Sequence, residues 1–145
     1  MKTIIAVYNS SGKGKSSTIL ELANLLLATP GCNIIFSSKP ATKLSVDFRL
    51  VIELSGKVIA LESQGDPGTH LQNRLDDIVN KYKPNLIFCT CRTRGETVAA
   101  VYNIAKANSY DLIWSTTYET KHSHQLVNRL KAEHLQDLII KIEII

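Results

Sequence analysis

Short apolar runs alternate with amphipathic helical patterns along the chain, and this alternation limits the possible folds more than any other feature. Most of the runs are nearly continuously apolar, as expected of strands in a sheet that is covered on both faces. Strands that alternate with helices predict βαβ units and an α/β protein with a three-layer α/β/α sandwich. The expected strands are Thr3–Tyr8, Asn33–Ser37, Arg49–Leu54, Lys57–Glu62, Asn85–Thr90, Asp111–Ser115 and Leu138–Ile144.

Four stretches carry apolar residues at helical spacing. In the first, apolar side chains recur at i, i+3, i+4 and i+7 from Ile19, and Pro30-Gly31 ends the pattern. The other three predicted helices lie at Leu71–Tyr82, Val98–Ala105 and near Lys121–Gln136. In the last of them, the apolar set is weaker and consists of Leu126, Leu130 and Leu135.

One connection departs from the βαβ rule. Between two of the expected strands, Leu54-Ser-Gly-Lys57 leaves room only for a tight turn, so these strands should form an antiparallel hairpin. The sheet should therefore be mostly parallel but mixed. Because no repeat, linker or low-complexity tract divides the 145 residues, we expect a single domain over 1–145.

Composition excludes several classes of protein. No window of 18 apolar residues is present, which argues against a membrane helix, and the apolar run near the N-terminus is too short for a signal peptide. The three cysteines are an odd number without CxxC spacing, which argues against a disulfide framework or a zinc site. We therefore expect a cytoplasmic protein without a membrane partner. A net charge of +4 suits an anionic ligand, but the basic residues lack the interleaved aromatic residues typical of nucleic-acid binding.

Residues 8–18 read YNSSGKGKSST and lie between the first predicted strand and the first predicted helix. They fit the pattern GxxxxGK[ST] except at its first position, where Asn9 stands; asparagine tolerates left-handed backbone better than most residues. In this pattern, glycines let backbone N–H groups turn toward an anion, the lysine reaches terminal phosphates and the hydroxyl binds Mg²⁺. The dipole of the following helix acts on the same anion. The alternative is a flexible surface loop with a helix cap at Ser16 or Ser17.

Through this Walker A motif the chain resembles the P-loop NTPase superfamily, firmly over roughly Met1–Leu27. The resemblance implies a P-loop NTPase fold in which Lys15 contacts the β- and γ-phosphates and Ser16 holds Mg²⁺. Ser10 stands where partition-type dimeric ATPases carry an extra lysine, which argues against that subclass. The nucleotide-binding residues that the resemblance implies are Ser11, Gly12, Lys13, Gly14, Lys15, Ser16 and Ser17.

An acidic segment follows the expected strand Lys57–Glu62. An apolar strand that ends in an acid resembles a Walker B segment, and Glu62-x-x-Gly65 is similar to the DxxG of GTPase-type proteins. Mg²⁺ held by one hydroxyl needs a carboxylate at a neighbouring strand end, and the sequence does not separate Glu62 from Asp66 in this role. Two structural alternatives stay open: Asp66 caps a helix that has Pro67 at its first position, and Glu62 is a solvated hairpin end.

Two arginines, Arg92 and Arg94, follow the strand Asn85–Thr90. In an open α/β sheet this strand end faces the same crevice as the phosphate-binding loop. The arginines could neutralise transition-state charge or clamp a second anionic group. An exposed basic loop that caps a helix through Thr97 is an equally good interpretation.

No NKxD or TKxD segment follows the later strands to read a guanine, so ATP is expected over GTP. The predicted function is Mg²⁺-dependent binding and hydrolysis of ATP or another nucleoside triphosphate. Two alternatives stay open: a nucleotide-dependent switch that binds a protein partner with little turnover, and a phosphotransferase for a small acceptor. The candidate catalytic residues are Lys15, Glu62, Asp66, Arg92 and Arg94, and the candidate metal ligands are Ser16 and Asp66.

Overall fold

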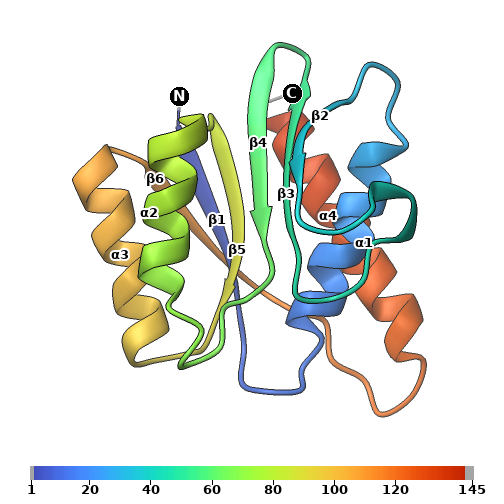
Figure 1. Ribbon diagram of the computed structural model, residues 1–145. Helices are drawn as coiled ribbons and strands as arrows, with labels where there is room; N and C mark the ends of the chain where they lie inside the picture. The colour runs from blue at the N-terminus through green and yellow to red at the C-terminus, as the bar shows by residue number, and fades with distance from the viewer. Residues whose placement is uncertain (1, 143–145) are drawn as a thin grey trace.

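A computed structural model describes residues 2–142 of the chain. Six strands form one sheet in the order β2-β3-β4-β5-β1-β6, with two helices against each face (Figure 1). This confirms the predicted α/β class and the mostly parallel, mixed sheet, and it is compatible with a three-layer α/β/α fold. The strands are β1 (Thr3–Tyr8), β2 (Asn33–Ser37), β3 (Arg49–Leu54), β4 (Lys57–Glu62), β5 (Leu86–Cys91) and β6 (Asp111–Thr116). The helices are α1 (Lys15–Leu27), α2 (Leu71–Tyr82), α3 (Glu96–Asn108) and α4 (His124–Lys141), with a 3₁₀ turn at Ala41–Lys43.

The predicted hairpin joins β3 and β4, which pair antiparallel from Arg49↔Glu62 to Leu54↔Lys57. Its two central residues, Ser55 and Gly56, both have positive φ (53° and 73°), as a type I′ turn requires. Strand β3 is also antiparallel to β2, whereas β4, β5, β1 and β6 pair in parallel. The single reversed strand is therefore the source of the mixed sheet.

The position of β5 corrects one expectation about the site. We expected the acidic segment at the end of a strand that neighbours β1, but β5 pairs with both β1 and β4 and so separates them. The segment from Ser63 to His70 therefore has to cross the end of β5 before any of its side chains can reach the loop after β1.

Two apolar cores lie on the two faces of the sheet. On one face, α1 and α4 pack against alternate residues of the strands, including Ile5, Leu61 and Phe88. On the other face, α2 and α3 cover the intervening residues, including Ala60 and Ile87 (Figure 1). The alternation follows from the period of two along a strand, and it decides on which face each polar residue at a strand end lies. Within residues 2–142, no helix combines the length and the apolar content needed to cross a bilayer.

Two expectations for the C-terminal part were wrong. The predicted strand Leu138–Ile144 is the last part of helix α4 up to Lys141, and its final two residues lie outside the described part of the chain. Apolar contacts with α1 recur at helical spacing through Ala132, Leu135 and Ile139, so the same helical face continues into the run that we interpreted as β-rich. Of the apolar set expected to face the core, Leu126 and Leu130 are exposed and only Leu135 is buried.

Strand β2 is one of the two edge strands of the sheet, and it departs from the expectation of strands covered on both faces. Ile34, Ile35 and Phe36 are all exposed. The pairing of β2 with β3 shifts register between Ile34 and Phe36, which places a bulge at Ile35. A bulge disturbs the regular spacing of unpaired backbone groups and so protects an apolar edge from pairing with other chains.

Candidate functional site

The loop between β1 and α1 turns on two glycines. Gly12 and Gly14 have φ of 72° and 83°, a left-handed backbone that other residues rarely adopt. Gly14 is also the N-cap of α1, and a Cβ there would lie 2.6 Å from Oδ1 of Asn128 on α4. The backbone conformation therefore requires glycine at position 14, whereas the Asn128 side chain could move aside for a Cβ.

Backbone amides of this loop are free to bind an acceptor. Within the described part of the chain, no amide from Ser11 to Ser17 donates a hydrogen bond, and α1 has no side-chain cap. The first regular bond of the helix runs from the Thr18 amide to the Gly14 carbonyl, at 2.9 Å. A run of such amides at a helix N-terminus is a typical binding site for an anion.

Asn9, the departure from the motif, fastens the loop through its side chain. It does not have a positive φ, so the left-handed backbone that we considered for it is wrong. Its Nδ2 instead donates to Oε1 of Glu119 (2.7 Å) and Oγ1 of Thr117 (2.9 Å), and its Oδ1 accepts from the Ser10 amide (2.7 Å). Thr117 in turn donates to the Lys13 carbonyl at 2.8 Å. The loop is thus tied to the segment that follows β6.

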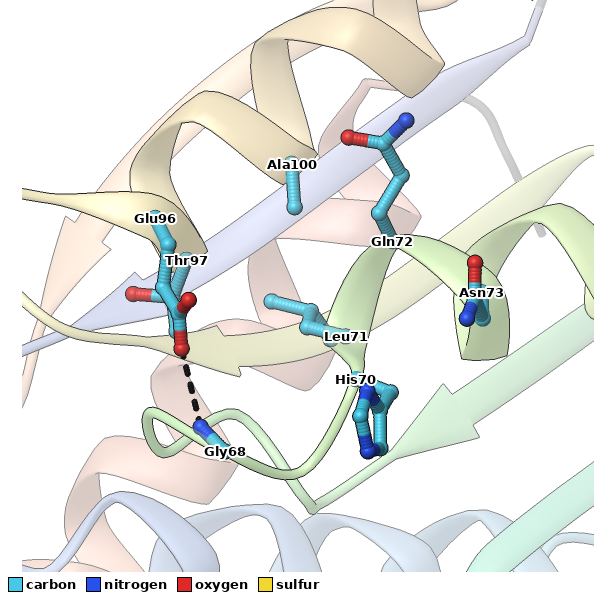
Figure 2. A pocket seen from close by; sticks show the side chains of 8 residues that line it. All are labelled: Gly68, His70, Leu71, Gln72, Asn73, Glu96, Thr97 and Ala100. Atoms are coloured by element: carbon cyan, nitrogen blue, oxygen red, sulfur yellow. Dashed lines mark hydrogen bonds between the residues drawn. The ribbon is translucent and has the colours of Figure 1, made fainter.

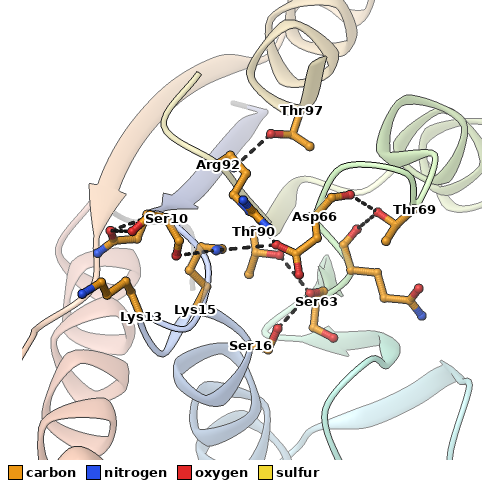
Figure 3. Close-up of polar contacts among 12 residues, drawn as sticks. Ser10, Lys13, Lys15, Ser16, Ser63, Asp66, Thr69, Thr90, Arg92 and Thr97 are labelled. Carbon is orange, nitrogen blue, oxygen red and sulfur yellow. Dashed lines mark hydrogen bonds and ion pairs between the residues drawn. The ribbon is translucent and has the colours of Figure 1, made fainter. Parts of the chain in front are cut away.

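Lys15 is the buried cation of the site, with 6% of its surface exposed. Its Nζ donates to the Ser10 carbonyl at 3.0 Å and lies 3.7 Å from Oδ1 of Asp66 (Figure 3). Burial lowers the pKa of Lys15, and the charge of Asp66 partly opposes this shift. The ammonium group therefore lies over the loop in a partly desolvated position where it gains from an additional anion.

Asp66 lies between two cations. Nε of Arg92 donates to its Oδ1 at 2.9 Å, and Lys15 approaches the same oxygen (Figure 3). The hydrogen bond from Arg92, assisted by the charge of Lys15, lowers the pKa of Asp66, so this carboxylate is ionised at neutral pH. Asp66 is not the helix cap that we considered, because α2 begins at Leu71 with His70 as its N-cap.

Ser16 is joined to the same segment through a backbone oxygen. The Ser63 carbonyl accepts from Oγ of Ser16 at 3.2 Å and from Oγ1 of Thr90 at 2.9 Å (Figure 3). Of the two predicted metal ligands, Ser16 at the start of α1 is thus bound to the segment after β4, and Asp66 belongs to that same segment. Oxygen ligands of this kind suit Mg²⁺, which proteins commonly hold with one or two side chains plus phosphate oxygens.

Gly65 allows the segment after β4 to pass directly over β5. A Cβ at this position would lie 1.7 Å from the backbone oxygen of Thr90 and 2.4 Å from its Oγ1. The glycine is needed here because of this close approach. It brings Asp66 within reach of Lys15 although a whole strand separates β4 from β1.

Replacing Gly65 with alanine should destabilise the protein by about 3 kcal/mol, the upper end of the usual range for overpacking. The added methyl group has to displace backbone, which also moves Asp66 away from Lys15. Thermal unfolding measures the stability loss. The control is Gly68→Ala, which removes a glycine from the same segment without a clash, since a Cβ at Gly68 meets no atom within 4 Å. Gly68 has a φ of 84°, so this control carries its own strain, of about 1 kcal/mol. Equal loss in both variants would contradict the close-approach argument.

Glu62 lies on the other face of the sheet from Lys15. It is fully buried, and its Oε1 accepts from Nε of Arg49 at 3.0 Å; Arg49 also donates to Asp77 on α2 at 2.6 Å. Burial raises the pKa of Glu62, and the charge of Arg49 opposes this rise. The solvated hairpin end that we considered for Glu62 is therefore wrong. Of the two acids that the sequence did not separate, only Asp66 contacts Lys15.

The structure also distinguishes the two candidate arginines by their contacts. Arg92 contacts Asp66, and its amide donates to Oγ1 of Thr97 at 2.9 Å. Helix α3 has Gly95 as its N-cap and no side-chain cap, so the helix cap through Thr97 that we considered is wrong. Arg94 is exposed and makes no hydrogen bond or ion pair with any residue of 2–142. Of the two, Arg92 alone is brought to Asp66.

A cavity of about 300 Å³ lies between the first turns of α2 and α3 (Figure 2). At its rim, the Gly68 amide donates to Oε1 of Glu96 at 2.8 Å, which fastens the segment after β4 to α3. Neither Lys15 nor Asp66 lines this cavity, so it is separate from the loop site.

The sequence analysis did not identify the residues of the segment after β6 that bind the loop. Thr117 and Glu119 are more than 100 positions from Asn9, and no local pattern marks them. The usable signal was topological: a strand that pairs with β1 must place its C-terminal end beside the loop. Asn128, which contacts Gly14 from α4, had no signal because the start of that helix was predicted from a weak apolar pattern.

Comparison with known proteins finds no matching family model, no matching curated protein and no matching solved structure. The resemblance to P-loop NTPases therefore rests on residues 9–16 and their surroundings.

Proposed function

We propose that the protein is a small P-loop NTPase that binds ATP with Mg²⁺ at the loop between β1 and α1 and hydrolyses it. The observation that carries the proposal is the buried Lys15, which lies over a run of free amides and beside Asp66. Two cations, Lys15 and Arg92, flank a single carboxylate there, so the group has a net positive charge. A polyphosphate would satisfy both the amides and the surplus charge.

Ser16 and Asp66 are the residues that would hold Mg²⁺ in this proposal. Ser16 donates to the Ser63 carbonyl, so its hydroxyl oxygen keeps lone pairs for a cation, and Asp66 is ionised. The metal would supply charge neutralisation at the terminal phosphates. The chain's own contribution is to orient the oxygen ligands and to keep Lys15 partly shielded from water.

The rate of ATP hydrolysis would depend on how well the site neutralises the charge that develops on the transferred phosphoryl group. In phosphoryl transfer, catalysis consists mainly of positioning and of neutralising charge on the transferred group. Arg92 uses Nε for Asp66, and its two terminal nitrogens donate to no other residue of 2–142. These nitrogens are the donors that would meet the developing charge on the γ-phosphate.

A preference for ATP over GTP is part of the proposal. The chain has no NKxD or TKxD segment. The carboxylate that follows β6, Glu119, accepts from Asn9 and lies 3.9 Å from Nζ of Lys13. These contacts support a role for Glu119 in holding the loop and not in reading a guanine.

One observation favours the alternative of a switch with little turnover. Glu62, one of the two acids considered for catalysis, is bound to Arg49 on the far face of the sheet. Asp66 is therefore the one remaining acid of the pair, and it would have to serve both as the metal ligand and as the acid that orients a water. A protein that binds ATP and changes shape for a partner, with slow hydrolysis, is consistent with this arrangement.

Replacing Lys15 with alanine should weaken Mg²⁺-ATP binding by about tenfold or more, the value of a charge-assisted hydrogen bond in a shielded site. Calorimetric titration measures the affinity, and phosphate release measures turnover. Lys106→Ala on α3 removes the same charge from an exposed position and should bind as the wild type does. Unchanged affinity in a folded Lys15→Ala variant would contradict the proposal, and ATP binding without phosphate release would favour the switch.

A further inference from the structure

Three aromatic side chains gather beside the loop site, on the sheet face that carries α3. The Tyr8 and Trp114 rings meet edge to face at 6.2 Å, and Tyr102 of α3 lies 5.2 Å from the Trp114 ring. Tyr102 is 55% exposed, and Tyr8 and Trp114 are half-buried. Three rings that gather in one place and stay partly open to solvent make this a candidate binding site.

These rings line a cavity of about 230 Å³. This volume is below the usual range for pockets that hold a drug-sized ligand, about 300–1,000 Å³, so the cavity suits a single ring system. The residues that line it are Tyr8, Arg92, Thr93, Val98, Tyr102 and Trp114.

Arg92 gives the cavity a charge. Nε of Arg92 is bound to Asp66, whereas its terminal nitrogens donate to no residue of 2–142. A guanidinium with free N–H groups binds phosphate or carboxylate, often with two parallel hydrogen bonds. The cavity thus combines ring surfaces with a donor for an anion. Arg92 is shared with the proposed loop site, so an anion bound in this cavity would compete with a γ-phosphate at the loop for the same nitrogens.

We infer that this aromatic cavity is a second binding site, for a small planar ring that carries an anionic group. The ring stacks on Tyr102 and Trp114, and its phosphate or carboxylate meets Arg92. Nucleoside monophosphates are members of this chemical class. The inference goes beyond nucleotide binding at the loop, and no nucleoside triphosphate is needed to test it.

Trp114 is the single tryptophan of the chain, so its fluorescence reports this cavity directly. The full chain is titrated with AMP, with adenosine, which lacks the anion, and with ribose 5-phosphate, which lacks the ring. We expect saturable quenching by AMP, binding of adenosine about tenfold weaker, and no quenching by ribose 5-phosphate. The quenching by AMP should not require Mg²⁺, because the proposed metal ligands of the loop site do not line this cavity.

Variants of Tyr102 and Arg92 test separately whether AMP binding depends on stacking against the ring and on the anion donor. Tyr102→Ala should weaken AMP binding by about fivefold or more, whereas Tyr102→Phe should keep it, since only the ring surface is used. Arg92→Ala should weaken AMP binding and leave adenosine binding unchanged. Absence of quenching by AMP, quenching that requires Mg²⁺, or unchanged affinity in Tyr102→Ala would each overturn the inference.

Discussion

Replacing Arg49 with methionine should destabilise the protein by about 3–5 kcal/mol at neutral pH, because the change leaves a buried carboxylate without its cation. Glu62 is fully buried, and Arg49 Nε lies 3.0 Å from its Oε1. Methionine retains an unbranched aliphatic stem, so the loss mainly reports the missing charge and hydrogen bonds. Denaturant unfolding monitored by circular dichroism measures it.

The loss should shrink as the pH is lowered. Burial raises the pKa of Glu62 and Arg49 opposes the rise, so removing Arg49 raises this pKa further. An acid whose pKa is higher in the folded than in the unfolded protein costs stability as the pH rises above its unfolded pKa, which is about 4.3 for glutamate. Below that pH, Glu62 is protonated in both states and the unpaired charge is absent. Stabilities of the two proteins measured between about pH 4 and pH 8 should converge toward the acid end.

Two controls isolate the pair. Adding Glu62→Gln to Arg49→Met should recover much of the loss at neutral pH, because no buried charge is then left. Lys81→Met removes an exposed partner of Asp77, 3.2 Å away, and should cost less than about 1 kcal/mol. A loss that does not vary with pH, or that the double variant does not relieve, would show that Arg49 acts through packing alone.

Replacing Arg92 with alanine should lower kcat for ATP by about a hundredfold or more, if the protein hydrolyses ATP as proposed. The terminal nitrogens of Arg92 would act on charge that develops only in the transition state, so the affinity for ATP should change little. Single-turnover phosphate release, with affinity measured separately, distinguishes the two effects.

Arg94→Ala is the informative comparison, because Arg94 stands two positions away and is exposed. Its kcat should stay within a few-fold of the wild-type value, since a solvated surface charge stabilises a distant transition state weakly. Equal losses in the two variants would contradict the assignment to Arg92. Normal hydrolysis in both would assign neither arginine to the reaction.

Local patterns predicted most of the fold. The two residues of the β3–β4 turn were enough to predict the hairpin, because only a tight turn fits between those strands. The apolar stripe of α1 was equally clear. The end of α4 was mistaken for a strand because its β-branched residues outweighed a helical spacing that is visible only when counted from Ala132. The order of the strands in the sheet could not be predicted, because the insertion of β5 between β1 and β4 depends on contacts between distant segments.

The candidate site was predicted in part. Residues 9–17 were proposed as a site from a contiguous motif. The proximity of Asp66 and Arg92 to Lys15 was predicted because strand ends converge at one edge of a parallel sheet. Only the structure showed which of the two acids, Asp66 or Glu62, lies beside Lys15. The three residues between them follow the end of β4 and cross over β5, and only the register of β4 decides that Glu62 points to α2.

The ties at Asn9 and Lys13 have a consequence for the thermodynamics of binding. Because side chains from the segment after β6 hold the loop at both points, its conformational entropy is lost when the chain folds. A ligand that binds there meets a receptor already in its final shape, so association carries only the cost of immobilising the ligand itself. Cutting the tie with Asn9→Ala would move that entropic cost back into the binding step, even though Asn9 supplies no charge.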